Sequence, residues 1–354
     1  MNRKLINSKM IVVLAVLLVL FMAVGHAEEE RTYRSGQWEY VVTDGSVKIV
    51  GYMYKEGSSG NLAIPGELEG YPVTGFGAAV FCERGDITSV TIPDGITDTG
   101  YGLFIDCFAL TSVSIPASVT RIGTDAFKGC VSLTSVIIPS SVTSIGKEAF
   151  SGCRSLASVT ILEGITSIEH QVFAYCTGLT SMTIPDGVTR IDDGAFGFSG
   201  LTSVFIPGSV TEIGAMNPFE GCPLMSIHVA ENNSAYTQID GVLYEKKGNK
   251  LLAYPGAREG GFVIPEDVSA ISDSAFSYCT GLTSVTIPDS VTIIGGWAFI
   301  GCTSLTTVII PASVTDIGRG AFSRCEELTL SVTKGSYAEQ YAQDNNIPYA
   351  LATE

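Results

Sequence analysis

The stretch Leu133–Ser155, which reads LTSVIIPSSVTSIGKEAFSGCRS, predicts the fold of most of this chain. A repeat of about this length is typical of a solenoid, in which each unit buries its apolar face only against its neighbours. The leading leucine returns every 23 residues, with one interval of 22, at Leu110, Leu133, Leu156, Leu179, Leu201 and Leu224, and the period resumes at Leu282, Leu305 and Leu328. We therefore expect one short coil of structure, stacked many times.

The first part of the unit, Ser135–Ile138, has the two-residue alternation of a short strand. Val136 and Ile138 are expected to point inward, which leaves the side chains between them pointing outward. Pro139 should end the strand, because proline has no N–H with which to continue a ladder. The same Ile-Pro step recurs in eight other units, so the corner that it makes is part of the repeat.

The second part of the unit begins with another extended piece, Val142–Ile145. Gly146 follows, and glycine there predicts either a positive φ or a close approach to another backbone segment. The Ala149-Phe150 pair and Cys153 close the unit. This last part is too short for more than a turn or two of helix, so we expect short 3-10 or α turns.

The combined pattern, L-x-x-V-x-I-P-x-x-V-x-x-I-G-x-x-A-F-x-x-C, resembles the BspA-like branch of the leucine-rich repeats over nearly all of the chain after residue 27. The resemblance implies a leucine-rich repeat solenoid: a β-rich, curved stack of short parallel strands with an N-terminal β cap and a short C-terminal helix. It also implies a bacterial surface location, adhesion to host matrix proteins and contact between cells.

The first 27 residues have the pattern of a signal peptide, with a basic start, an apolar run and small residues at the cleavage position. An uncleaved membrane anchor is the alternative. The apolar run, Met10–Val24, is shorter than the ~20 residues that a spanning helix needs, so we expect cleavage and no stable membrane span afterwards. The mature protein is then secreted or held at the cell surface.

Three further parts are expected after the leader. Residues 28–62 form an N-terminal β-hairpin cap, in which Trp38–Val42 and Val47–Val50 flank a turn at Asp44-Gly45. Residues 63–330 form the repeat solenoid, with a β-hairpin insertion at about 235–262 where the period breaks. Residues 331–354 form a C-terminal cap that contains the short helix.

The composition disfavours binding to nucleic acid or to an anionic membrane. The net charge is −16, and removal of the three basic residues of the leader takes it to −19. Nucleic acids and anionic membranes bind to basic patches, and in this chain acidic residues outnumber basic ones.

Eight of the nine cysteines lie three residues after the phenylalanine of a unit, so they should stack in one column. Buried free thiols are the favoured interpretation, because cysteine packs as a small apolar residue and Ser199 occupies the same column. A few disulfides between neighbouring units are the alternative. A metal ladder is disfavoured, since the cysteines are ~23 residues apart without a C-x-x-C pair or nearby histidine.

No combination of residues predicts catalysis, a cofactor or a metal site. Only His170 and His228 remain after the leader, on different units, and the acidic residues at the coil corners are typical of turns. We therefore predict a non-enzyme.

The candidate site is the outward face of the first strand of each unit, which we expect to be the concave face of the solenoid. The face combines hydroxyl side chains with isolated apolar ones, and such surfaces often bind partners. A structural alternative is that β-branched and hydroxyl side chains simply suit a flat sheet. The candidate residues are Ser135, Ile137, Ser158, Thr160, Ser181, Thr183, Ser203, Phe205, Ser226, His228, Thr307 and Ile309.

These features predict a non-catalytic, exported or cell-surface protein that binds a protein or glycan, such as host extracellular matrix or another cell surface. A structural spacer or self-assembling surface module is the alternative, and an accessory module of an enzyme is a further one.

Overall fold

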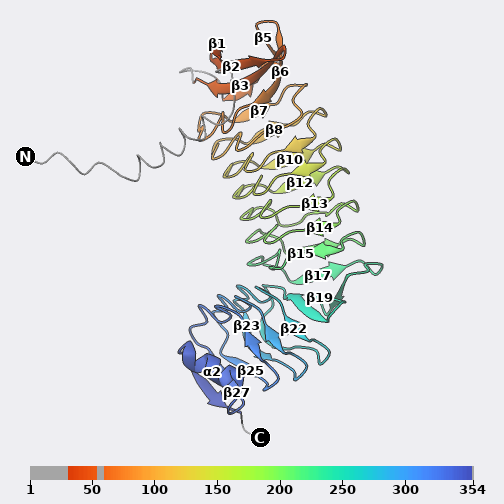
Figure 1. Cartoon of the computed structure of the whole chain (residues 1–354), viewed down its shortest axis with the longest axis vertical. Coiled ribbons are helices and arrows are strands. Elements are labelled where there is room, and N and C mark those ends of the chain that lie inside the picture. The colour runs from red at the N-terminus through yellow and green to blue at the C-terminus, as the bar shows by residue number, and fades with distance from the viewer. Residues whose placement is uncertain (1–30, 54–59, 353–354) are drawn as a thin grey trace, which may run out of the picture.

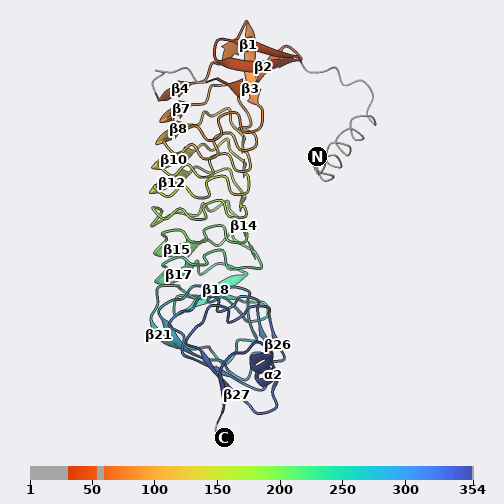
Figure 2. The same ribbon diagram turned by 90° about the vertical axis from the view of Figure 1, so that its left-hand side faces the viewer.

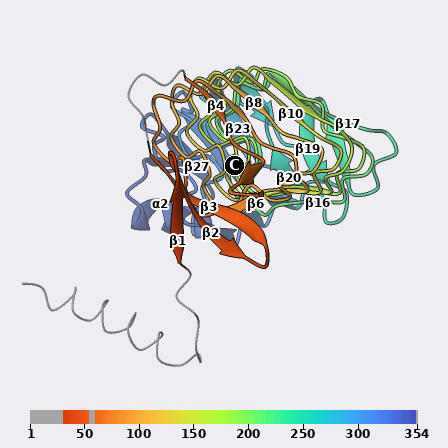
Figure 3. The same ribbon diagram turned by 90° about the horizontal axis from the view of Figure 1, so that it is seen from above.

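The computed structural model describes residues 31–53 and 60–352, so the expected signal peptide lies outside the described residues. The chain forms an elongated β-solenoid of about 13 turns. Its N-terminal sheet lies at one end and the short helix α2 lies near the other (Figures 1 and 2). Seen along the stack, the coils lie over one another in outline (Figure 3).

Two columns of parallel strands run along the stack. The first column consists of β4 (Asn61–Ala63), β7 (Ser89–Thr91), β8 (Ser112–Ser114), β10 (Ser135–Ile138), β12 (Ser158–Ile161), β15 (Ser203–Ile206), β17 (Ser226–Val229), β21 (Gly260–Val263), β23 (Leu282–Thr286), β25 (Thr307–Ile310), β27 (Thr329–Val332) and β28 (Tyr349–Leu351). The second consists of β9 (Arg121–Ile122), β11 (Ser144–Ile145), β13 (Ser167–Ile168), β14 (Arg190–Ile191), β16 (Glu212–Ile213), β20 (Lys250–Ala253), β22 (Ala270–Ile271), β24 (Ile293–Ile294) and β26 (Asp316–Ile317).

The register of the pairs follows the sequence repeat. Val136 of β10 lies beside Val159 of β12, so equivalent residues of successive coils are direct neighbours. Each buried side chain therefore packs on its own counterpart, which is why the same residue types recur at the same positions.

The return segment of each coil consists of short, successive hydrogen-bonded turns, as expected, and none of them continues as a helix. Lys128 donates its backbone N–H to Asp125, and Cys130 donates to Phe127. Asp125 and Gly129 have φ values of 56° and 73°. A residue in the left-handed region cannot continue a right-handed helix, so two such positions per coil limit the segment to turns.

The glycine that recurs after the second strand of a coil is explained by the close approach of the backbone of the preceding coil. A Cβ atom on Gly123 would lie 1.9 Å from the carbonyl oxygen of Gly100, and one on Gly146 would lie 2.4 Å from the backbone nitrogen of Thr124. Neither glycine has a positive φ. Of the two explanations that the sequence allowed, the close approach is confirmed.

Stacked phenylalanine rings form the centre of the core. The rings of Phe127 and Phe150 are 5.3 Å apart and almost parallel, and the same stacking runs without a break from Phe81 to Phe219. A second ladder runs from Phe276 to Phe322. The core is thus divided into two stacks of coils.

Both ends of the solenoid are covered. At the N-terminus, β1 (Thr32–Ser35), β2 (Trp38–Thr43), β3 (Ser46–Tyr52), β6 (Tyr71–Phe76) and β5 (Glu67–Leu68) form one sheet in that order. At the C-terminus, helix α2 (Tyr337–Asp344) begins at its N-cap residue Ser336 and buries Ala338 and Ala342. The caps keep the apolar faces of the terminal coils out of water.

An antiparallel insertion separates the two stacks. Strands β18 (Tyr236–Ile239), β19 (Val242–Glu245) and β20 pair in sequence order, and β20 then joins β22 in the second column. The solenoid changes direction near β19 (Figure 1). In the part of the chain that the structure describes, no helix is long and apolar enough to cross a membrane.

Candidate functional site

The outward side chains of the first strand column lie along each stack on one side of the coils, and we call this surface the strand face. In β10, Val136 and Ile138 are buried while Ser135 and Ile137 are exposed, as the alternation predicts. The parallel register then brings Ile137 beside Thr160 of the next coil. The strand face is therefore built by the repeat itself.

Ten of the twelve predicted residues lie in the N-terminal stack, and Thr307 and Ile309 lie in the C-terminal stack on β25. Ser181 and Thr183 belong to a coil with no assigned strand, although both are exposed. Ser226 and Thr307 are half-buried, and the other ten side chains are exposed.

The apolar members of the face are far more exposed than apolar side chains in the core. Ile137 is 63% exposed and Phe205 is 54% exposed. Ile137 lies beside Thr160 and Phe205 lies beside His228, so each apolar side chain has a polar neighbour on the next coil. Large exposed apolar side chains on a rigid sheet are candidates for contact with a partner.

The pair Ser226 and His228 is the nearest arrangement to a catalytic dyad on this face. The serine Oγ and the histidine Nε2 are 2.9 Å apart. Both residues lie on β17 and point outward, because they are two positions apart on a strand. Among the described residues, no carboxylate is hydrogen-bonded to His228, so the third group that orients the base in a hydrolytic triad is not supplied.

The predicted columns are interrupted between the two stacks, which corrects the expectation of one row running along the whole rod. Strand β17 pairs only with β15, and β21 pairs only with β23. The reason is the inserted hairpin, whose Gly241 carbonyl accepts the N–H of Ile227 on β17 at 2.9 Å. The tip of the hairpin lies where the next parallel strand would otherwise begin.

Sequence reasoning missed three exposed apolar residues near this interruption, namely Met225, Ile239 and Val263. Val263 is 67% exposed and could have been found, because it precedes Ile264-Pro265 just as Ile137 precedes Ile138-Pro139. Ile239 lies on the insertion, outside the repeat, so no column of the pattern could have indicated it.

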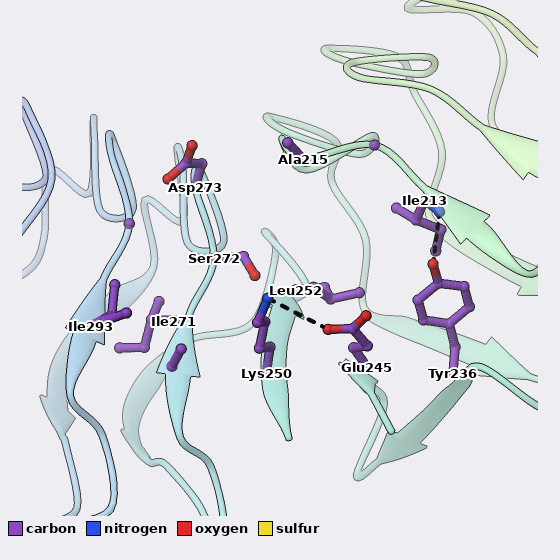
Figure 4. Close-up of a pocket in the computed structure, with 13 residues that line it drawn as sticks. Ile213, Ala215, Tyr236, Glu245, Lys250, Leu252, Ile271, Ser272, Asp273 and Ile293 are labelled. Atoms are coloured by element: carbon purple, nitrogen blue, oxygen red, sulfur yellow. Dashed lines mark hydrogen bonds and ion pairs between the residues drawn. The ribbon is translucent and has the colours of Figure 1, made fainter. Parts of the chain in front are cut away.

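A recess of about 330 Å³ lies on the opposite side of the junction, where the second strand column is interrupted between β16 and β20 (Figure 4). The Tyr236 hydroxyl accepts the N–H of Ile213 at 2.7 Å and so takes the place of a strand carbonyl. Burial raises the pKa of Tyr236, so this phenol is protonated near neutral pH. Lys250 and Glu245 lie 3.8 Å apart in the recess.

Nothing in the described ranges indicates a resident metal ion. No group of three or more histidine, cysteine or acidic side chains in residues 31–53 and 60–352 is placed to hold a metal. The predictions of no metal and no cofactor stay predictions.

The repeat found in the structure matches a known family model. The model for the BspA type leucine rich repeat region matches residues 69–134, 120–240 and 260–342, which together are more than half of the chain. The chain belongs to this family. The resemblance seen in the sequence is thereby confirmed. No curated protein matches the chain in sequence.

Several solved structures are similar to this BspA-type protein. A leucine rich cell surface protein from Faecalibacterium prausnitzii is 33% identical with a TM-score of 0.72, and the match covers 90% of this chain and 98% of that one. A leucine-rich repeat protein from Eubacterium ventriosum is 28% identical with a TM-score of 0.57, covering 86% and 73%. The pneumococcal vaccine antigen PcpA, at 20% identity, a TM-score of 0.61 and coverage of 86% and 82%, shares the fold.

Proposed function

We propose that this BspA-type protein is a non-catalytic, exported protein that binds a protein or glycan partner through the strand face. Its role would be adhesion to a host matrix or contact between cells. The observation that carries the proposal is the exposure of Ile137 and Phe205 on a rigid, hydroxyl-rich sheet. The similarity to a cell surface protein of Faecalibacterium prausnitzii supports the location.

The strand face suits binding because its side chains are already ordered. Strands of the face pair with strands of adjacent coils, as β10 does with β12 and β15 with β17, so a partner that contacts the face does not need to order flexible loops first. Exposed apolar side chains supply most of the binding energy in typical interfaces, while surrounding polar groups exclude water. Phe205 is the residue most suited to such a role, since aromatic side chains are enriched at binding hot spots.

The test is capture of partners by the immobilised protein, followed by measurement of affinity. The bait is exposed to extracellular matrix proteins, to a host-cell surface extract and to a glycan array. The variant Phe205→Asp is compared with Tyr175→Asp, which changes an aromatic residue of similar exposure, 47%, on the return side of the coil. Aspartate is compatible with the Tyr175 backbone, because Asp106 occupies the equivalent position of another coil with φ of 54°.

We expect Phe205→Asp to lower the affinity for the captured partner by about tenfold or more, and Tyr175→Asp to change that affinity by less than about threefold. Equal effects of the two variants would contradict a site on the strand face. Self-association without any captured ligand would favour a structural module.

A further inference from the structure

The edge of β21 that faces the N-terminal stack is unpaired. β21 hydrogen-bonds to β23 on one side only, through register pairs such as Phe262 with Val285. In a parallel strand the backbone groups of alternate residues point to opposite sides, so those of Gly261 and Val263 point away from β23. Among the described residues, no hydrogen bond joins these two N–H and two C=O groups to a partner.

The opposing edge of β17 is only partly satisfied. Ile227 donates its N–H to Gly241 of the hairpin tip, as described above. For Val229, at the other end of β17, the described residues supply no hydrogen-bond partner on this side. Arg258 holds the hairpin tip by donating to the carbonyl and carboxylate oxygens of Asp240, at 2.7 and 2.9 Å. The hairpin tip therefore pairs with the first half of β17, whereas the second half of β17 and Val263 of β21 have no strand between them.

Two inward side chains at this place are less buried than the residues with which they pair. Phe262 is half-buried, whereas Val285, which pairs with it on the next coil, is buried. Val229 is likewise half-buried, whereas Ile206, its partner on the preceding coil, is fully buried. The interruption thus leaves backbone hydrogen-bonding groups of β21 unpaired, beside two half-buried apolar side chains.

We propose that an extended peptide segment of a partner protein adds to β21 as a parallel strand. Unpaired N–H and C=O groups that alternate along an exposed strand are complementary to another extended backbone, which can satisfy all of them together. The segment that fits has the alternation of the first column itself, with β-branched side chains inward and small hydroxyl side chains outward. This inference rests on the proposed function and names the chemical class of the partner.

The probe is a synthetic peptide with the sequence of residues 281–290, GLTSVTIPDS, blocked at both ends and labelled with a fluorophore. Its binding to the protein is measured by fluorescence polarisation, alongside a scrambled peptide of the same composition. Val263→Pro removes the N–H that would donate to the peptide. Proline is tolerated on an edge strand whose N–H is not used, so the variant should fold. Val263→Thr is the matched control, because it is also β-branched and keeps the N–H.

We expect Val263→Pro to weaken peptide binding by about tenfold, and Val263→Thr to change it by less than about threefold. Melting curves of both variants establish that they are folded. Equal binding by the two variants, equal binding of the scrambled peptide, or no binding by the parent protein would each overturn strand addition.

The same assay separates this inference from the proposed function. Phe205 lies on β15, outside the interruption, so Phe205→Asp should leave binding of the peptide unchanged. A captured partner that depends on Phe205, together with no peptide binding, would retain the strand face as a site and reject strand addition at β21.

Discussion

At the scale of the residue, the cysteine column shows how one side chain meets two demands of the core. The thiol of Cys153 donates to the carbonyl oxygen of Phe127 in the preceding coil at 3.2 Å, and Cys176 does the same to Phe150. The thiol packs as a small apolar side chain, and it adds a second hydrogen bond to the Phe127 carbonyl, which also accepts the backbone N–H of Cys130. All nine cysteines are free in this structure, with Cys82 and Cys325 half-buried, and the free-thiol interpretation stays a prediction.

The first prediction concerns thiol reactivity. Burial raises the pKa of Cys176 to about 12 and that of Cys222 to about 11, so these thiols stay protonated near pH 8 and cannot react as thiolates. A thiol-reactive dye should label at most Cys82 and Cys325 in the native protein, and all nine cysteines after denaturation. Mass spectrometry of the labelled peptides is the measurement.

The same shift predicts a loss of stability in alkali. Because the pKa of Cys176 is raised from 9.0 to about 12 on folding, its contribution is complete below pH 9 and falls as the pH rises from 9 toward 12. Thermal midpoints measured across this range should decrease. Replacement of Cys176 by serine should reduce this decrease, and an unchanged pH profile in that variant would argue against the thiol as its source.

At the scale of the element, the conformation of each coil depends on its contacts with the adjacent coils. Phenylalanine rings stack at the repeat distance of the coils, and the glycines after the second strand permit the backbones to approach closely. Residues of the left-handed region divide each return into turns, which lets the chain reverse direction within a few residues. A change at one such position is therefore felt by the adjacent coil.

Substitution of the closely approached glycine tests this dependence. Gly123→Ala would place a Cβ atom 1.9 Å from the Gly100 carbonyl oxygen, so two coils must move apart. We expect a loss of about 2–4 kcal/mol of unfolding free energy, measured by urea denaturation. Gly187→Ala is the matched control, since its Cβ would meet only the Ile165 carbonyl at 3.5 Å, and its effect should be below about 1 kcal/mol. Similar losses in both variants would contradict the steric explanation.

At the scale of the whole molecule, the hairpin insertion joins two stacks of coils whose cores are separate. Leu243 on β19 is buried in the N-terminal core, whereas its neighbours Val242 and Tyr244 are buried in the C-terminal core. Alternate residues of one strand thus contribute to both cores. Solenoids behave as rows of units coupled to their neighbours, and here β19 contributes to the coupling, together with contacts such as the hydrogen bond from the Asn217 side chain to the Ser274 carbonyl.

Weakening this coupling should separate the unfolding of the two stacks. Leu243→Ala removes apolar contacts on the N-terminal side of β19, with an expected cost of about 2–5 kcal/mol. Hydrogen exchange measured in increasing urea should then show the N-terminal coils opening before the C-terminal ones. Leu330→Ala, buried at the far end of the C-terminal stack, is the control and should not favour opening of the N-terminal coils. A single transition in both variants would show that the stacks are coupled by other contacts.

The repeat made the regular coils predictable from sequence. Ser135–Ile138 alternates in burial as expected, and Pro139 follows the strand. The place of Ile137 and Phe205 on an exposed face could be predicted for the same reason, since a period of two fixes which side chains point outward. Short turns were expected in the return segment, but the positive φ of residues such as Asp125 was not predicted, since non-glycine residues only rarely adopt that conformation.

The sequence by itself determined the solenoid, the position of the cysteine column and the alternation of the strand face. All three depend on local periodicity, which each coil repeats without reference to distant parts of the chain. Only the tertiary structure decided that the strand face is interrupted, that β19 belongs to two cores, and that Val263 lies on an unpaired edge. These depend on how an irregular insertion packs between regular stacks, and packing against distant residues leaves no period in the sequence.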